Sequence, residues 1–199
     1  MSIVAGRAPA LAYRNAVIDG IRGLLREGDV KSAIDFGAGD GFVASEMRRL
    51  LACEDITALD VKIRQKLFHP VSVFDGTRIP CKSASSELVY AIDVLHHTKN
   101  PIHCIDEMMR CTSRYLMLKD HTYRTKLDYA VLSVLDELGN RRFGIPSVYN
   151  YQYGYDWIDY IESKGFERVR LIHPFDVEGR FWGAYTNRLQ YLGLWKFRG

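Results

Sequence analysis

The chain has 199 residues, of which 47% are hydrophobic and 26% charged, and its formal net charge is +3. This composition excludes a disordered chain, and the small net charge excludes a strongly basic nucleic-acid-binding protein. Uncharged apolar runs stay well below the roughly 20 residues that span a bilayer, and Arg7 and Arg14 interrupt the N-terminal stretch before it reaches signal-peptide length. We expect a single cytoplasmic domain over residues 1–199, with no membrane span and no nucleic-acid partner.

The cysteines do not suggest a metal site. Cys53, Cys81, Cys104 and Cys111 form no CxxC pair, and the chain has no Cys/His cluster with zinc-finger spacing. We expect reduced, unpaired thiols and no bound metal.

Helical and strand patterns alternate along the chain. Helices are expected over 9–27, 43–51, 101–109, 127–138 and 155–164. Strands are expected over 32–36, 56–61, 71–74, 87–95, 115–120 and 167–172, and the tail RLQYLGLWKF (188–197) is expected to form a final edge strand. The strands read as continuous apolar runs, which is typical of a parallel sheet. The sequence therefore predicts a doubly wound α/β fold, with a mostly parallel sheet covered by helices on both faces and an antiparallel last strand.

Glycines and polar residues follow five of these strands. The strand ends carry Gly37-Ala38-Gly39-Asp40-Gly41, Asp60, Asp75-Gly76, Asp93 with His96-His97, and Asp120-His121. Ligands of such sheets bind at the carboxyl ends of the strands, so these residues are expected to line one site.

The glycine loop and Asp60 predict a nucleoside cofactor. Glycines let a ligand approach the main chain, and Asp60 lies where this architecture places a carboxylate that binds ribose hydroxyls. The loop is GxGxG rather than GxGxxG, and it carries the negative charge of Asp40. Both features disfavour a dinucleotide, and hence a nucleotide-dependent oxidoreductase, and favour a cofactor with a cationic amino-acid end.

Four segments, AIDFGAGDG, the strand tip at Asp60, VFDGTRIPC and ELVYAIDVLHHTKNP, resemble in order and spacing a class I S-adenosylmethionine-dependent methyltransferase over about residues 10 to 120. LDELGNRRFGIPSVYNY is similar to a segment of some small-molecule methyltransferases. The resemblance implies the Rossmann-like methyltransferase fold, S-adenosylmethionine as methyl donor and S-adenosylhomocysteine as product. CTSRYLML stands where the family usually has a glycine-rich turn, which suggests a divergent branch. The chain also lacks the family's motifs for adenine and cytosine methylation in DNA.

The resemblance also implies roles for individual residues. The glycine loop (Gly37, Ala38, Gly39 and Gly41) would line the methionine and ribose parts of the cofactor, with Asp35 supporting the loop. Asp60 would bind the ribose, Val61, Phe74, Asp75 and Gly76 would surround the adenine, and Asp93 would face the methionine end. Arg14 would meet the cofactor carboxylate or be a surface charge.

Methyl transfer to oxygen or nitrogen often needs a base, and histidine is the usual candidate near neutral pH. His96, His97 and His121 all lie at the expected edge of the sheet, and the sequence does not choose among them or exclude a structural role. Residues 1–28 are expected to form the N-terminal helix region, and residues 140–165 a lid or substrate cap. In that cap an extended GIPSVYNYQYGYDW would place Tyr149, Tyr151, Tyr153, Tyr155 and Trp157 on one side, either against substrate or packed on the sheet. Tyr149, Tyr151, Tyr153 and Trp157 are the expected substrate contacts.

The function expected from the sequence is methylation of an O, N or C atom of a small molecule. A non-catalytic cofactor-binding subunit of another protein, and an RNA or protein methyltransferase, remain as alternatives.

Overall fold

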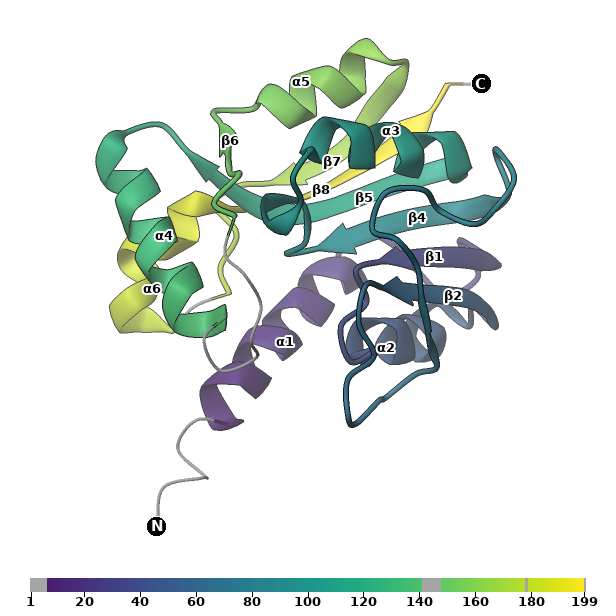
Figure 1. Ribbon diagram of the computed structural model, residues 1–199, viewed down its shortest axis with the longest axis horizontal. Helices are drawn as coiled ribbons and strands as arrows, with labels where there is room; N and C mark the ends of the chain where they lie inside the picture. Colours follow the sequence, from purple (N-terminus) through teal and green to yellow (C-terminus); the bar gives the residue numbers. More distant parts are fainter. Residues whose placement is uncertain (1–6, 141–147, 178, 199) are drawn as a thin grey trace.

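The computed structural model describes residues 7–140, 148–177 and 179–198. In chain order the elements are α1 (Arg7–Arg22), β1 (Ser32–Phe36), α2 (Phe42–Leu51), β2 (Asp55–Asp60), β3 (Val71–Val73), β4 (Ser86–Ile92), η1 (Leu95–His97), α3 (Pro101–Cys111), β5 (Thr112–Tyr123), α4 (Lys126–Asn140), β6 (Gln152–Tyr153), α5 (Asp156–Ser163), β7 (Phe166–Ile172), α6 (Arg180–Thr186), η2 (Asn187–Leu189) and β8 (Gln190–Phe197). The elements form one sheet with helices on both faces (Figure 1).

The strand order is β3-β2-β1-β4-β5-β8-β7, with the short β6 beside β5. Strands β1 to β5 are parallel, and β8 runs antiparallel to both β5 and β7. Strand order reverses between β1 and β4, which makes the space beyond their carboxyl ends the expected ligand position. The predicted fold class, including the antiparallel last strand, is confirmed.

Alternation along the strands divides the core into two layers. Leu116 and Leu118 of β5 pack with residues of α3 and α5 on one face, whereas Met117 packs with residues of α1 and α2 on the other. Because successive side chains of a strand point to opposite faces, a strand buried on both sides is apolar along most of its length.

The tail is not an edge strand, so that expectation is wrong. β8 lies between β5 and β7, and its residues Gln190 to Trp195 are all buried. The edge position belongs to β7, whose residues Glu167 to Arg170 are exposed.

The predicted helix over 127–138 exists as α4, but it buries a different face from the expected one. Leu127, Val134 and Leu138 are exposed, while Leu132 packs with Tyr151 and Leu189 in a small separate cluster. α4 lies beside α6, past the end of β5, and not on the sheet itself (Figure 1). Among the described residues no helix is long and apolar enough to cross a membrane.

Candidate active site

The loop after β1 has three glycines with positive φ: Gly37 (84°), Gly39 (61°) and Gly41 (74°). A Cβ on Gly37 would lie 2.5 Å from the Val94 methyl groups, and one on Gly41 would lie 2.8 Å from the His69 carbonyl oxygen. A Cβ on Gly39 would meet nothing within 4 Å. Gly37 and Gly41 therefore allow tight packing, whereas Gly39 faces open space that a ligand can enter.

Asp60 joins this loop to the end of β2. It is 7% exposed, and its Oδ2 accepts a hydrogen bond of 2.7 Å from the Gly39 amide while Oδ1 accepts one of 3.0 Å from the Lys62 amide. Each carboxylate oxygen retains acceptor capacity, so both could also bind hydroxyl groups. The loop and the carboxylate predicted from the sequence are thus neighbours, and the two acceptor oxygens fit the hydroxyl groups of a ribose.

Asp35 lies buried beneath the loop, beside Tyr90 in the register of β1 and β4. Its Oδ2 has no hydrogen-bond partner among the described residues. Burial, with the nearby charges of Asp60 and Asp40, raises the pKa of Asp35 to about 8. Asp35 is therefore mostly protonated at neutral pH.

Residues expected at the adenine gather past the ends of β2 and β3. Asp75 is exposed and its Oδ1 accepts hydrogen bonds from the Thr77 and Arg78 amides, which lower the pKa of its carboxyl group. A Cβ on Gly76 would lie 2.8 Å from Val61, whose side chain is 63% exposed. The Phe74 ring packs edge-on against Phe36, with ring centroids 5.3 Å apart.

Arg14 of α1 is not a free cation. Its guanidinium pairs with Asp40 of the glycine loop at 2.7 Å and lies 4.9 Å from the centroid of the Phe42 ring. A cofactor carboxylate would have to share Arg14 with Asp40.

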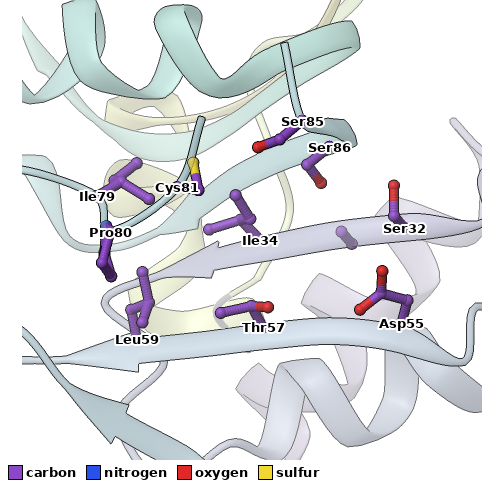
Figure 2. Close-up of a pocket in the computed structure, with 11 residues that line it drawn as sticks. Ser32, Ile34, Asp55, Thr57, Leu59, Ile79, Pro80, Cys81, Ser85 and Ser86 are labelled. Carbon is purple, nitrogen blue, oxygen red and sulfur yellow. The ribbon is translucent and has the colours of Figure 1, made fainter. Parts of the chain in front are cut away.

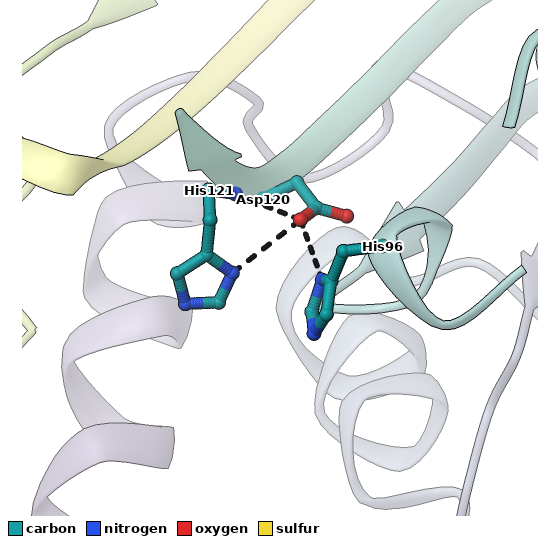
Figure 3. A group of neighbouring side chains, drawn as sticks. All are labelled: His96, Asp120 and His121. Atoms are coloured by element: carbon teal, nitrogen blue, oxygen red, sulfur yellow. Dashed lines mark hydrogen bonds and ion pairs between the residues drawn. The ribbon is translucent and has the colours of Figure 1, made fainter. Parts of the chain in front are cut away.

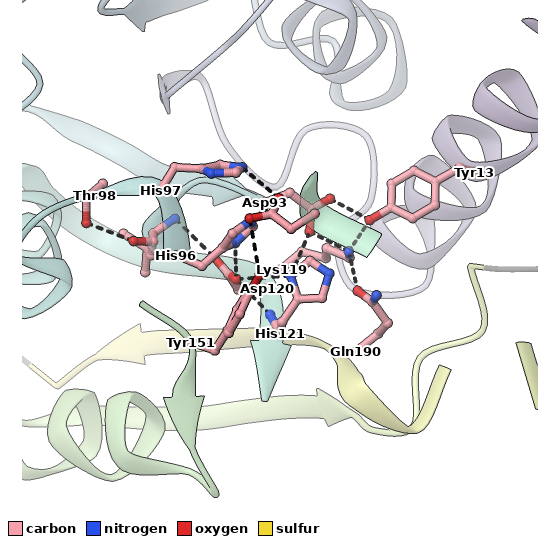
Figure 4. A network of polar contacts seen from close by, with 12 residues as sticks. Tyr13, Asp93, His96, His97, Thr98, Lys119, Asp120, His121, Tyr151 and Gln190 are labelled. Carbon is pink, nitrogen blue, oxygen red and sulfur yellow. Dashed lines mark hydrogen bonds and ion pairs between the residues drawn. The ribbon is translucent and has the colours of Figure 1, made fainter. Parts of the chain in front are cut away.

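Asp93 has a positive φ of 56° and belongs to a buried network (Figure 4). Lys119, which is fully buried, donates to Asp93 at 2.5 Å, to the Gln190 side-chain oxygen at 2.6 Å and to the Tyr13 hydroxyl. Tyr13 in turn donates to Asp93 at 2.6 Å. Burial opposes ionisation of Asp93, but the Lys119 charge dominates and lowers the pKa of Asp93.

His96, Asp120 and His121 form a second cluster at the ends of β4 and β5 (Figure 3). Asp120 Oδ1 accepts from His96 Nδ1 at 2.6 Å and from the His121 amide at 2.7 Å, and it lies 3.4 Å from His121 Nδ1. Burial opposes protonation of His96, but the Asp120 carboxylate raises the pKa of His96 to about 10. Burial lowers the pKa of His121.

His97 and Asp136 extend this cluster toward α4. Asp136 Oδ1 lies 3.7 Å from the Nε2 atoms of both His96 and His97, and the two imidazole rings are 3.9 Å apart. Burial and the His96 charge lower the pKa of His97 to about 4. The three predicted histidines are therefore neighbours.

Sequence reasoning did not assign Tyr13, Lys119, Asp136 and Gln190 to the site. Lys119 could have been recognised from the sequence, because a lysine inside the apolar strand YLMLKD is expected to be buried and then needs a partner of opposite charge. Asp136 could not have been recognised, since its position depends on how α4 docks.

The aromatic segment is not extended. Tyr149 has a φ of 60°, β6 is only two residues long, and α5 begins at Asp156. Tyr151 is buried and stacks 5.5 Å from the His96 ring, whereas Tyr153 is 55% exposed. Trp157 packs in the core. The aromatics therefore do not share one side, and residues 141–147 of the expected lid lie outside the described ranges.

A cavity of about 110 Å³ lies elsewhere, along the amino-terminal halves of β1 and β2 (Figure 2). It is lined by Ser32, Asp55, Thr57 and Cys81 among others. Its volume is below the range of small-molecule sites, and it lies away from the strand ends, so it is not the cofactor site.

Comparison with known proteins agrees with this geometry. The profile of a methyltransferase domain family matches residues 11–176. A search of curated proteins finds no match.

Solved structures similar to this chain include an S-adenosylmethionine-dependent methyltransferase from Mesorhizobium loti, with 12% identity, a TM-score of 0.66 and coverage of 91% of this chain and 97% of the other. An S-adenosylmethionine-dependent methyltransferase from Thermotoga maritima has 15% identity, a TM-score of 0.61 and coverage of 94% and 92%. At these identities the structures establish the fold alone. Because the family profile covers most of the chain, the protein belongs to the methyltransferase domain family, and it has the fold of class I S-adenosylmethionine-dependent methyltransferases.

Proposed function

We propose that this enzyme transfers a methyl group to an O, N or C atom of a small molecule. The observation that carries the proposal is the hydrogen bond between Gly39 and Asp60. It joins the open glycine loop to the Asp60 carboxylate, and both lie at carboxyl ends of parallel strands, as the histidine cluster does.

The proposed cofactor site uses the residues expected from the sequence. Asp60 binds the ribose hydroxyls, and the open face of Gly39, with Gly37, Ala38 and Gly41 behind it, admits the ribose and methionine parts. Val61, Phe74, Asp75 and Gly76 surround the adenine, Asp93 faces the methionine amino group, and Arg14 lies near the carboxylate. Bound there, S-adenosylmethionine supplies an electrophilic methyl group.

We propose His121 as the base among the three candidate histidines. Asp120 holds the Nδ1 side of His121, so Nε2 is left to accept a proton from the acceptor. His96 is a poorer candidate because its side chain is buried and its two ring nitrogens face Asp120 and Asp136. Replacing His121 by Gln should slow turnover, measured as S-adenosylhomocysteine release, without weakening cofactor binding.

A small acceptor suits the enclosure of the cluster. Asp136 of α4 and Tyr151 before β6 lie against His96, and Tyr13 of α1 donates to Asp93, which lies 3.8 Å from His121 Nδ1. Such enclosure supports a small molecule over a polymer. Tyr149 and Tyr153 remain proposed acceptor contacts, whereas Trp157 is omitted because it packs in the core.

A second candidate is a methyltransferase that works with a protein partner on a larger substrate such as RNA or protein. It is favoured by similarity to a chain in the complex of the Haloferax volcanii Trm112 methyltransferase activator with a methyltransferase, with 11% identity, a TM-score of 0.59 and coverage of 95% and 97%.

Thermal melting of the purified chain with separate ligands tests the proposal. S-adenosylmethionine and S-adenosylhomocysteine should raise the melting temperature, because they bind only the native state, and NAD should not. S-adenosylhomocysteine release is then measured against panels of phenols, amines and enols and against RNA and protein extracts. Turnover confined to RNA or protein, or dependent on an added partner, would overturn the small-molecule assignment.

A further inference from the structure

Three potential metal-ligand atoms converge beside the proposed base. They are His96 Nε2, His97 Nε2 and Asp136 Oδ1, and all lie within 4.8 Å of one another. The two distances from Asp136 Oδ1 are each 3.7 Å, which is too long for a hydrogen bond. Figure 4 shows His96 and His97 side by side at the end of β4.

These distances suit two ligands of one ion. Zinc ligands lie about 2.0–2.1 Å from the metal, so atoms at tetrahedral to trigonal angles are separated by about 3.3–3.6 Å. The two separations from Asp136 need to shorten by only a few tenths of an ångström. The neighbouring group of His96, Asp120 and His121 is less suitable, because the His96–Asp120 contact of 2.6 Å is a hydrogen bond with no room for an ion.

Asp120 orients His96 for this role. It accepts the Nδ1–H of His96, so the lone pair of the neutral ring is on Nε2, the atom that faces Asp136. Asp120 is itself fixed by the Leu95 and His121 amides. A carboxylate that holds the far nitrogen of a ligating histidine is the usual support of a protein metal site.

The same cluster has both an enclosed side and an accessible side. The His96 side chain is 2% exposed, Asp136 10% and His97 21%, so an ion would enter along His97. The Tyr151 hydroxyl donates to Asp136 Oδ2 at 3.2 Å, and Asp136 Oδ1 is the atom that lies 3.7 Å from both imidazole Nε2 atoms. Three protein ligands leave a fourth position open, as in catalytic zinc sites.

We propose that His96, His97 and Asp136 bind a divalent transition-metal ion of the zinc type, with the fourth position available to an oxygen or nitrogen atom of the acceptor. Two imidazoles and one carboxylate suit zinc, iron or cobalt and do not suit magnesium, which prefers an all-oxygen shell. This proposal replaces the expectation of no metal. The proposal of metal binding does not depend on the proposed function. The proposal that the ion takes part in methyl transfer does rest on the proposed function.

The competing occupant is a proton. A second proton on His96 would make it a cation between Asp120 and Asp136 and would neutralise the same charges. Zinc must displace that proton to bind, so a direct measurement of metal binding separates the two cases.

The test uses the untagged full chain after removal of metals with a chelator. Cobalt(II) is titrated in as a spectroscopic probe, and zinc is then added to displace it. We expect visible absorption bands of four-coordinate cobalt, saturation at about one equivalent, displacement by zinc, and a melting temperature raised by zinc but not by magnesium. Absence of cobalt and zinc binding would overturn the proposal and leave the proton as the occupant.

Matched variants locate the ion. Asp136→Asn and His97→Gln should each weaken zinc binding by at least about tenfold. His103→Gln, which changes an exposed histidine of α3, and Cys81→Ser, which changes a partly exposed thiol, should bind zinc like the parent chain. Unchanged binding by both His97→Gln and Asp136→Asn, or loss of binding in either control, would overturn the proposed location.

The melting shift caused by S-adenosylhomocysteine is recorded for every variant. Its persistence shows that the variant is folded and that the cofactor site is intact. Its absence from the parent chain would contradict the cofactor proposal while leaving the metal result unaffected. His97→Gln, at the more exposed ligand, keeps the test valid if Asp136→Asn does not fold.

Discussion

Gly39 donates its amide hydrogen to the Asp60 carboxylate over 2.7 Å, and this contact ties the loop after β1 to the end of β2. The two features that predict a nucleoside cofactor from the sequence are therefore one structural unit, and its parts can be tested separately.

Asp60→Ala should weaken S-adenosylhomocysteine binding by about 10- to 100-fold, because hydrogen bonds to a charged group contribute roughly 1.5–3 kcal/mol. Isothermal titration calorimetry measures the change. Asp55→Ala, at the exposed start of the same strand, is the control and should bind like the parent chain. Equal affinities for the Asp60 variant and the parent would refute the ribose assignment.

Two glycine substitutions should separate stability from cofactor binding. Gly37→Ala should lower the free energy of unfolding by about 2–4 kcal/mol, because the new methyl group collides with Val94 and occupies a left-handed backbone conformation. Gly39→Ala should cost only about 1–2 kcal/mol, since it meets no neighbour, yet it should abolish the melting shift caused by the cofactor.

Urea unfolding and cofactor melting shifts measure both effects. Val94→Ala should restore part of the stability of Gly37→Ala. A Gly39→Ala variant with full cofactor affinity would show that the ligand does not approach this part of the loop.

Asp35 should make the protein less stable as pH rises. Its pKa is about 8 in the folded protein against 3.8 for the ordinary group, so between these values the folded state binds the extra proton. The free energy of unfolding should fall across this window by up to about 1.4 kcal/mol per pH unit, and the loss should be complete above the folded pKa.

Urea unfolding of Asp35→Asn across the same window provides the comparison. The amide does not titrate, so the variant should gain stability relative to the parent as pH rises. Asp75→Asn, at an exposed carboxyl group, should not produce this gain. Parallel pH profiles for the parent and Asp35→Asn would show that Asp35 is ionised in the folded protein.

Lys119→Met should destabilise the fold by about 3–5 kcal/mol, because it leaves the Asp93 carboxylate without its buried cation. Adding Asp93→Asn should recover part of this loss. Lys196→Met, at an exposed lysine of β8, is the matched control and should change stability by less than about 0.5 kcal/mol. Equal stabilities of the Lys119 and Lys196 variants in urea unfolding would contradict the buried ion pair.

The fold was predictable from the sequence where a pattern reports local burial. SAIDF and ELVYAIDVL are apolar on both faces of a strand, and the structure buries both in the sheet. The position of the tail was not predictable in the same way. Whether RLQYLGLWKF lies at the edge or between β5 and β7 depends on contacts with distant strands, and an apolar run is compatible with either place.

The site was predictable at the strand tips and not beyond them. Gly39, Asp60 and the histidines follow strands directly, so parallel topology alone brings them to one edge. Asp136 reaches the histidines from α4, whose docking away from the sheet leaves Val134 exposed. Trp157 was expected in the lid together with the tyrosines before it. Helix α5 begins at Asp156, and the sequence does not show where the aromatic segment ends and this helix begins.

The central place of β8 has a consequence for biosynthesis. β5 and β7 both precede it in the chain, and neither can pair with β8 until Gln190 to Phe197 have left the ribosome. Until then the nascent polypeptide presents two unprotected strand edges, which are templates for aggregation. A premature stop codon shortly before Gln190 would therefore be far more damaging than its distance from the catalytic residues suggests.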